Sequence, residues 1–337
     1  MSSCGSGPVL QTHLSRNAGT NNDLNVSEVR GLLNYKLSCC VNALLQSFSA
    51  TTELLDILNK WHPSNGTDKS NVPLQLKNIL EAMRNKSYPA PYKDFLNCLY
   101  RQAIQRWTEQ DADEIFHIIL SLTQKQIADA VLAQEISSLY EIKLETQVGC
   151  LNCKFIQRMP NSLFSLPLAI CERENSLENC INSFFQLQKL ADSEKVYCEK
   201  CEKKQPSTYE LKLVSLPPIL CVHLKRFRND DGFPRKLYNK VTFPETFRTA
   251  IFAAGQSEAE CLSSDEHYSL YAVVVHKGTT VSGHYTAFIS PNQEKMWYYA
   301  DDNCVRPSTW TDVQGTYGGY RQRYGETAYL LLYRKNS

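Results

Sequence analysis

The sequence of 337 residues lacks any apolar run close to the ~20 residues that a membrane-spanning helix needs. Its N-terminus also lacks the charged-then-apolar pattern of a secretory signal. Net charge is nearly absent, because 36 Lys and Arg balance 35 Asp and Glu and leave a formal charge of +1. With such a balance the whole chain lacks the excess positive charge that attracts nucleic acid or an anionic membrane surface. We therefore expect neither nucleic-acid binding nor membrane insertion.

Two motifs that mark other enzyme classes are also missing. The sequence holds no Gly-Lys dipeptide, which excludes the phosphate-binding loop of nucleotide-driven enzymes. None of its cysteines is followed six positions later by the arginine that a cysteine-based phosphatase uses. If one of the cysteines is catalytic, its chemistry is therefore expected to be of another kind.

Cysteine itself is plentiful, with 13 in the chain, an odd number. Without a secretory signal, this count argues against a disulfide framework and favours metal binding or catalysis in a reducing compartment. We therefore expect a cytoplasmic protein, with the nucleus as a further compartment. An apolar content of 42% is that of a globular chain rather than a disordered one.

The chain divides into three stretches by its residue pattern. Residues 1–29 are rich in Ser, Gly, Asn and Thr and predict a flexible tail. From residue 31 to about residue 135, apolar residues recur three and four apart, which predicts helices. After residue 141 short alternating runs predict strands, and these runs lengthen after residue 268. Helices followed by mostly antiparallel strands predict an α+β fold with segregated parts.

Four of the cysteines form two C-x2-C pairs, which residues 154–197 separate. Two thiolates on one tight turn can bind a Zn²⁺ ion at ~2.3 Å, and a second turn completes a closed tetrahedron. A site of this kind is structural, since four sulfurs leave no open position, and we expect no cofactor for catalysis. The competing interpretation is four unrelated buried cysteines. The expected zinc ligands are Cys150, Cys153, Cys198 and Cys201.

A candidate nucleophile stands just before an amphipathic run. Cys39 and Cys40 precede the segment VNALLQSFS, so Cys39 is expected at a helix N-terminus. The positive end of the helix dipole and the unpaired amides there stabilise a thiolate, the reactive form of cysteine. The same amides can donate to an oxyanion, and the side chain of Asn34 can add a donor. Alone, the pattern also fits a structural cysteine, because buried cysteines are common.

The candidate base lies far along the chain. His284 opens an expected strand directly after Gly283, where another backbone segment can approach closely. A further expected strand ends in Asp301 and Asp302. A cysteine paired with a histidine that an acid orients is the arrangement of thiol proteases, here in the chain order Cys, His, Asp. Two other histidines lie inside apolar runs and are expected in the core: His223 and His276.

Together these motifs resemble those of the ubiquitin-specific proteases over residues 30–335. GLLNYKLSCCVNALLQ resembles the family's cysteine box, and EQDADEIFHIIL resembles its glutamine-glutamine-aspartate box. The C-x2-C pairs resemble the family's zinc finger. The family's sheet segment is matched by LPPILCVHLKRF with KVTFP, and its histidine box is matched by YAVVVHKGTTVSGHYTAFI with WYYADD. The resemblance implies a papain-like architecture. It comprises a helical thumb over about 30–140, antiparallel fingers with a zinc-binding tip over about 141–215, and an antiparallel palm over about 216–335.

The resemblance also implies a role for each site residue. Cys39 would be the nucleophile and His284 the base. Asp301 would orient the imidazole, Asn34 would donate to the oxyanion, and Asp302 would be the supporting acid. Asp111 and Glu114, three apart on an expected helix, would contact the basic tail of the modifier. The competing interpretation is an ordinary solvated acidic helix start. Gly283 and Tyr285, on either side of the base, would also lie against the substrate.

Within the family, the chain resembles the interferon-induced member, which removes an interferon-stimulated modifier built from two ubiquitin-like folds. The doubled cysteine, the single-domain length and the terminal TYGGYRQRYGETAYLLLY carry this likeness. It implies a thiol isopeptidase that cleaves after the C-terminal Gly-Gly of that modifier and dampens type I interferon signalling. The alternatives are a general ubiquitin-cleaving enzyme and a non-catalytic scaffold that binds an interferon receptor chain and signalling transcription factors.

Some residues depart from the family pattern. Lys36 stands in place of a Gly, Ser38 in place of a Thr and Glu109 in place of a Gln. Lys36 can alter the loop that bears the oxyanion donor, or it can favour the nearby thiolate. The run Asp111-Ala-Asp113-Glu114 is closer to the general ubiquitin-cleaving members. The preferred modifier, ubiquitin or the interferon-stimulated one, is therefore left open by the sequence.

Overall fold

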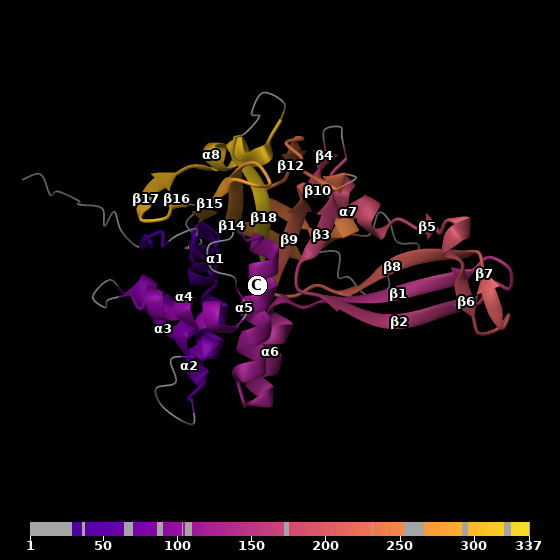
Figure 1. The fold of residues 1–337 in the computed structure, drawn as a ribbon, viewed down its shortest axis with the longest axis horizontal. Coiled ribbons are helices and arrows are strands. Elements are labelled where there is room, and N and C mark those ends of the chain that lie inside the picture. Colours follow the sequence, from indigo (N-terminus) through magenta and orange to yellow (C-terminus); the bar gives the residue numbers. More distant parts are fainter. Residues whose placement is uncertain are drawn as a thin grey trace, which may run out of the picture.

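The computed structural model describes residues 29–35, 38–63, 70–85, 90–102, 104, 110–171, 175–230, 232–252, 266–291, 296–319 and 325–336. The predicted tail over residues 1–29 lies outside these ranges apart from Val29, as do Lys36 and Glu109. Among the described residues, no helix is both long enough and apolar enough to cross a membrane. The fold combines a group of helices, a large sheet and a narrower projecting sheet (Figure 1). The predicted combination of helices and antiparallel strands is confirmed.

The helical part comes first along the chain. It comprises α1 (Cys39–Ser49), α2 (Thr52–Lys60), α3 (Val72–Arg84), α4 (Tyr92–Gln102), α5 (Ala112–Gln126) and α6 (Ala130–Tyr140). Three of these helices begin after a residue whose side chain accepts hydrogen bonds from the amides of the first turn, which stabilises the helix start. These N-cap residues are Asn71, Asp111 and Asp129.

The large sheet follows the order β17-β16-β15-β14-β18-β9-β3, with β13 paired to β14. Its pairs are antiparallel except for β3 and β9, which run parallel. Its strands are β3 (Leu166–Ala169), β9 (Ile219–Lys225), β13 (Thr246–Arg248), β14 (His267–Gly278), β15 (Gly283–Ile289), β16 (Trp297–Asp301), β17 (Cys304–Ser308) and β18 (Thr327–Lys335).

The narrower sheet, of order β2-β1-β8-β5, projects to the right in Figure 1 and carries the hairpin β6–β7 at its far end. These strands are β1 (Ile142–Cys150), β2 (Ile156–Leu163), β5 (Gln188–Lys189), β6 (Val196–Cys198), β7 (Lys203–Gln205) and β8 (Ser207–Ser215). Between β2 and β5 the chain returns to the large sheet, where β3 pairs with β9 and α7 (Leu177–Phe185) packs beside β3. The stretch 141–215 therefore contributes to both sheets.

Several short elements lie outside the two larger sheets. β10 (Phe227–Asp230) and β11 (Phe233–Lys236) form a separate hairpin, and β4 (Asn175–Ser176) pairs in parallel with β12 (Val241–Thr242). Helix α8 (Trp310–Gln314) follows β17.

Helix α1 lies inside the molecule rather than on its surface. Every residue from Cys39 to Phe48 is buried. The helix packs against α2, α3 and α5 as well as against β14, β15 and β16 of the large sheet. A helix that is buried all round occupies a core position, so α1 joins the helical part to the sheet.

A buried arginine ties the large sheet to the segments beside it. Arg226 is fully buried, and its guanidinium donates to four backbone carbonyls. Nε lies 2.7 Å from the oxygen of Ala328, Nη1 lies 3.0 Å and 2.9 Å from those of Leu237 and Asn239, and Nη2 lies 3.3 Å from that of Tyr317. Burial lowers the pKa of Arg226 to about 10, so the group stays charged at neutral pH.

We expect Arg226→Met to lower the free energy of unfolding by at least about 3 kcal/mol, because each buried carbonyl left without a donor costs ~1–3 kcal/mol. Urea unfolding of both proteins measures the difference. Arg228→Met is the matched control, since Arg228 is exposed on β10, and its change should stay within about 0.5 kcal/mol. Equal effects at the two positions would contradict the assigned role of Arg226.

Candidate active site

The candidate nucleophile stands at the start of the buried helix. Cys39 is the first residue of α1 and is 7% exposed. Ser38, the N-cap residue, does not cap the first-turn amides with its side chain. Amides without a cap and the positive end of the helix dipole both favour a thiolate at this position.

His284, the second residue of β15, lies between two groups that the sequence predicts as its partners. Its Nε2 is 2.7 Å from Oδ1 of Asp301, the last residue of β16. Hydrogen bonds with Cys39 and, to a smaller extent, with Asp301 raise the pKa of His284 to about 9, although partial burial opposes this shift. Because Nε2 faces Asp301, Nδ1 is the nitrogen directed at the thiol. The structure thus brings the three predicted groups into one row.

Asp302 lies next to this row, in the turn between β16 and β17. Its Oδ2 accepts a hydrogen bond from Nδ2 of Asn34 at 2.9 Å and lies 3.9 Å from Nε2 of His284. The amide of Ser38 donates to Oδ1 of Asn34 at 3.2 Å, which fixes the orientation of this side chain. A primary amide has two N–H donors, so Asn34 has a second N–H besides the one that Asp302 accepts.

One residue that the sequence analysis did not assign to the site contacts the same carboxylate. Nδ2 of Asn42 donates to Oδ1 of Asp302 at 2.6 Å. The signal that could have found Asn42 is its position, since it is a polar residue in a largely apolar helix. It lies three residues after Cys39 and therefore on the same face of α1.

The two acidic residues predicted to contact the modifier's tail differ in their surroundings. Asp111 is the N-cap of α5, and its Oδ1 accepts the amides of Asp113 and Glu114 at 2.8 Å and 3.4 Å. Its Oδ2 accepts the hydroxyl of Tyr329 on β18. The carboxylate of Asp113 is likewise held, 3.1 Å from Nδ1 of His223. Glu114 is exposed, so its carboxylate is the one presented to the surface.

Gly283 and Tyr285 are turned toward the protein's own interior. A Cβ atom at Gly283 would lie 2.1 Å from Nε2 of His276, so that ring requires a glycine here. The ring of Tyr285, which is 5% exposed, lies 4.7 Å from the ring of His276. Burial, with the nearby charges of Lys236 and His284, lowers the pKa of His276 to about 3 and keeps it neutral. His276 is therefore a core residue, as the sequence predicts.

The four predicted zinc ligands lie together at the far end of the narrower sheet. The Sγ atoms of Cys150 and Cys201 are 4.0 Å apart, those of Cys153 and Cys198 are 3.5 Å apart, and all four lie within 4.8 Å of one another. Four thiolates at ~2.3 Å from a tetrahedral zinc ion would be separated by about 3.8 Å. The sulfur positions therefore fit a structural zinc ion.

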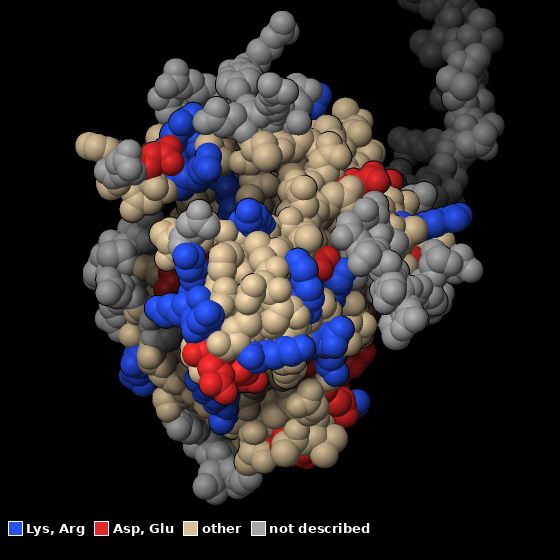
Figure 2. Space-filling model, turned by 90° about the vertical axis from the view of Figure 1, so that its right-hand side faces the viewer, with Lys and Arg blue, Asp and Glu red and all other residues tan. Residues whose placement is uncertain are grey.

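The two C-x2-C turns also share an unusual backbone conformation. The residue directly after each second cysteine has a positive φ, 62° at Lys154 and 54° at Glu202, which non-glycine residues seldom adopt. Backbone hydrogen bonds within the first turn lower the pKa of Cys150 to about 7, which favours the thiolate. Figure 2 looks onto this end of the molecule and shows basic side chains spread over it. The exposed lysines near the cluster are Lys154, Lys195, Lys200, Lys203 and Lys204.

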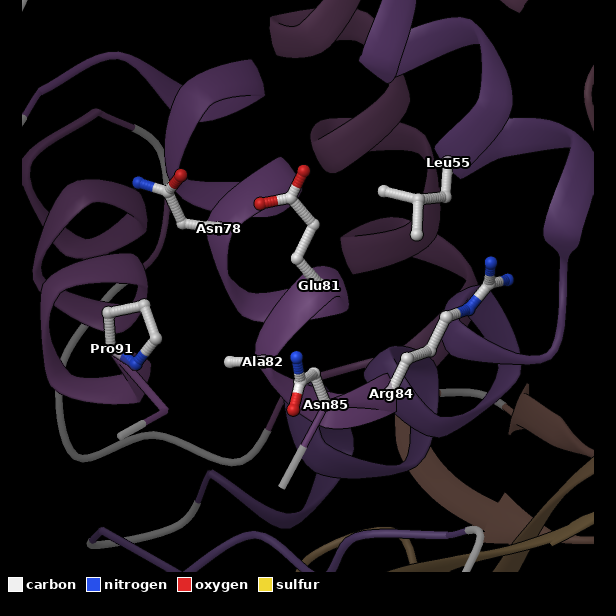
Figure 3. Close-up of a pocket in the computed structure, with 7 residues that line it drawn as sticks. All are labelled: Leu55, Asn78, Glu81, Ala82, Arg84, Asn85 and Pro91. Atoms are coloured by element: carbon white, nitrogen blue, oxygen red, sulfur yellow. The ribbon is translucent and has the colours of Figure 1, made fainter. Parts of the chain in front are cut away.

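A pocket in the helical part is separate from these groups. Figure 3 shows it between α2, α3 and the residue before α4. Its lining combines apolar side chains with a glutamate, an arginine and two asparagines, and it includes none of the predicted site residues. The lining residues are Leu55, Asn78, Glu81, Ala82, Arg84, Asn85 and Pro91.

Comparison with known proteins identifies the family. Among curated proteins, the chain is 30% identical over 315 residues to "Ubl carboxyl-terminal hydrolase 18" from Homo sapiens, with 90% of this chain and 84% of that protein covered. It is 32% identical over 314 residues to the protein of the same name from Mus musculus, with 90% and 85% covered. "Ubiquitin carboxyl-terminal hydrolase 47" from Homo sapiens is 24% identical over 402 residues, which cover 98% of this chain and 29% of that protein.

A family model agrees with these relatives. The model described as "Ubiquitin carboxyl-terminal hydrolase" matches residues 30–333. The matched span contains the row formed by Cys39, His284 and Asp301 as well as the four clustered cysteines. The chain therefore belongs to the ubiquitin carboxyl-terminal hydrolase family of cysteine peptidases.

Proposed function

We propose that the protein is a thiol isopeptidase that cleaves after the C-terminal Gly-Gly of a ubiquitin-like modifier and removes it from target lysines. The observation that carries this proposal is the row in which His284 lies between Cys39 and Asp301. A thiolate, an imidazolium that can donate a proton and an orienting acid are the groups that acyl transfer from an amide requires.

The proposed reaction proceeds through a thioester. The thiolate of Cys39 attacks the last glycine carbonyl, and the amides at the start of α1 with Nδ2 of Asn34 donate to the oxyanion. His284 gives its proton to the lysine nitrogen, and the C–N bond breaks. The neutral imidazole then takes a proton from water, the new C–O bond forms, and the C–S bond breaks, which restores the thiolate and releases the modifier's carboxylic acid, whose proton passes to solvent.

The choice of modifier is proposed from the relatives. The names of the relatives at 30% and 32% identity specify a ubiquitin-like modifier, and with the sequence resemblance they favour the interferon-stimulated tandem modifier over ubiquitin. Of the acidic residues near the start of α5, Glu114 is exposed and can pair with a basic tail. The carboxylate of Asp111 already accepts hydrogen bonds from an amide of its own helix and from the hydroxyl of Tyr329.

On the resemblance alone, we also propose that the protein acts in the cytoplasm and nucleus as a negative regulator of type I interferon signalling. The proposed non-catalytic partners are an interferon receptor chain and signalling transcription factors. This role does not depend on the thiol chemistry.

We expect a modifier that carries a C-terminal electrophilic warhead to form a covalent adduct on Cys39, and Cys39→Ala to abolish it. Intact-protein mass spectrometry after incubation measures the adduct. Cys40→Ala is the matched control, because Cys40 is the adjacent thiol and burial raises its pKa well above the usual value. This control should still be labelled.

Labelling of both variants, or of neither, would contradict the assignment of Cys39. Ubiquitin and the tandem modifier bearing the same warhead should be compared in the same experiment. Faster labelling by ubiquitin would leave the isopeptidase intact and would reverse the proposed choice of modifier.

The rate of modifier cleavage should fall as pH rises through about 9, which is the raised pKa of His284. Above this pH the imidazolium has lost the proton that it gives to the leaving amine. Asp301→Asn removes one of the two hydrogen bonds that raise this pKa, so the alkaline limb should move to lower pH. Initial rates with a tail-fluorogenic modifier measure the profile. The control is Asp56→Asn, at an exposed position on α2, which should leave the alkaline limb at the pH of the unaltered protein. An alkaline limb that does not shift in Asp301→Asn would contradict the role of Asp301.

We further propose that Cys150, Cys153, Cys198 and Cys201 bind one structural zinc ion. A metal bound only by the folded chain adds its binding free energy to stability. Elemental analysis should therefore find one zinc per chain, and Cys198→Ser should lose the metal and melt at a lower temperature. Cys171→Ser, at an exposed cysteine outside the cluster, should change neither quantity. Zinc-free protein with an unchanged melting temperature would contradict the site.

A further inference from the structure

The chain just before α1 is docked on the turn that carries Asp302, directly after Asp301 at the end of β16. The amide of Leu32 donates to the carbonyl oxygen of Asp302 at 2.9 Å. At Gly31 a Cβ atom would lie 2.4 Å from the backbone oxygen of Asn303, so the two backbones touch. This docking brings residues near position 30 into contact with residues near position 300.

Asn42 contributes a buried side chain to this docking. It is 2% exposed on α1, and its Nδ2 donates to Oδ1 of Asp302 at 2.6 Å. The same nitrogen lies 3.4 Å and 3.5 Å from the carbonyl oxygens of Leu32 and Leu33. Asn42 therefore links the helix that carries the candidate nucleophile to the turn that carries Asp302.

The two oxygens of Asp302 have different partners. Oδ1 takes the short hydrogen bond from Asn42, which leaves Oδ2 for Nδ2 of Asn34 at 2.9 Å, and Oδ2 lies 3.9 Å from Nε2 of His284. The backbone of Asp302 has a φ of 50°, a conformation that persists only where the surroundings determine it. A rotation of this carboxylate would move the acceptor that orients Asn34.

We propose that Asn42 is a positioning residue for the proposed isopeptidase reaction: through Asp302 it holds the amide of Asn34 and the imidazole of His284 in their working orientation. The inference rests on the proposed function. An amide suits this position because it donates to a carboxylate without adding a second negative charge. An aspartate at position 42 would place two carboxylates together, and at neutral pH they would repel each other.

The same helix supplies a matched control for a purely structural role. Gln46, one turn after Asn42, is also 2% exposed, and its Nε2 donates to the carbonyl oxygen of Arg30 at 2.7 Å. Both side chains have a buried amide oxygen, Oδ1 of Asn42 and Oε1 of Gln46, that no described residue donates to. Gln46 anchors the same N-terminal segment but does not touch Asp302.

The test compares Asn42→Asp with Gln46→Glu in the full chain, by kcat, KM and melting temperature with a tail-fluorogenic modifier. Asn42→Asp should lower kcat about 100-fold at neutral pH, the usual effect of losing one oxyanion donor, with KM unchanged. Its kcat relative to the unaltered protein should rise as pH falls, because one of the paired carboxylates then takes a proton and donates to the other. Gln46→Glu should lower the melting temperature and leave the kcat ratio flat across pH.

A double variant tests the contact itself and serves if Asn42→Asp fails to fold. In Asn42→Asp with Asp302→Asn, the amide at position 302 can donate to the new carboxylate and still accept from Asn34. Its kcat should exceed that of Asp302→Asn alone. Equal kcat for those two proteins, or a flat pH ratio for Asn42→Asp, overturns the inference. Failure of the unaltered chain to label with the warhead would refute the proposed function instead.

Discussion

The candidate site depends on the burial of α1 between the helical part and the large sheet. This helix is buried along its length and packs against β14, β15 and β16, and its first residue lies beside His284 near the start of β15. The hydrogen bonds of Leu32 and Asn42 with Asp302 hold the start of α1 beside the turn between β16 and β17. Hydrophobic packing brings the two parts together, and a few short polar contacts fix their register.

The features that the sequence predicted are those carried by local pattern. Helical periodicity predicted the helical stretch that contains α1 to α5, and alternating or continuous apolar runs predicted the strands after residue 268, among them β14, β15, β16 and β18. The spacing of the C-x2-C pairs predicted a four-cysteine cluster, which the structure contains. Each of these signals lies within a window of a few residues, or within a motif whose meaning does not depend on distant neighbours.

The features that escaped prediction depend on partners far along the chain. Asn42 is bound by a carboxylate 260 positions later, and the carboxylate of Asp111 is occupied by a tyrosine 218 positions later. The sequence predicts that another backbone segment approaches Gly283 closely, and the backbone of β14 does so, but the ring of His276 that also fills this space was not predicted. Helix α7 was missed because it has nine residues and lies between short strands. Local pattern cannot specify contacts of this kind.

His276 lies on β14, the strand paired with the one that carries His284, and the pKa values of the two rings are about 3 and about 9. Two neighbouring imidazoles with similar affinities for protons would titrate as a coupled pair, and their charge would change in two overlapping steps. Burial lowers the pKa of His276, whereas hydrogen bonds with Cys39 and Asp301 raise that of His284, so between the two steps the site carries a single imidazolium. Acidification below neutral pH therefore adds no second positive charge at His276 until the pH approaches about 3.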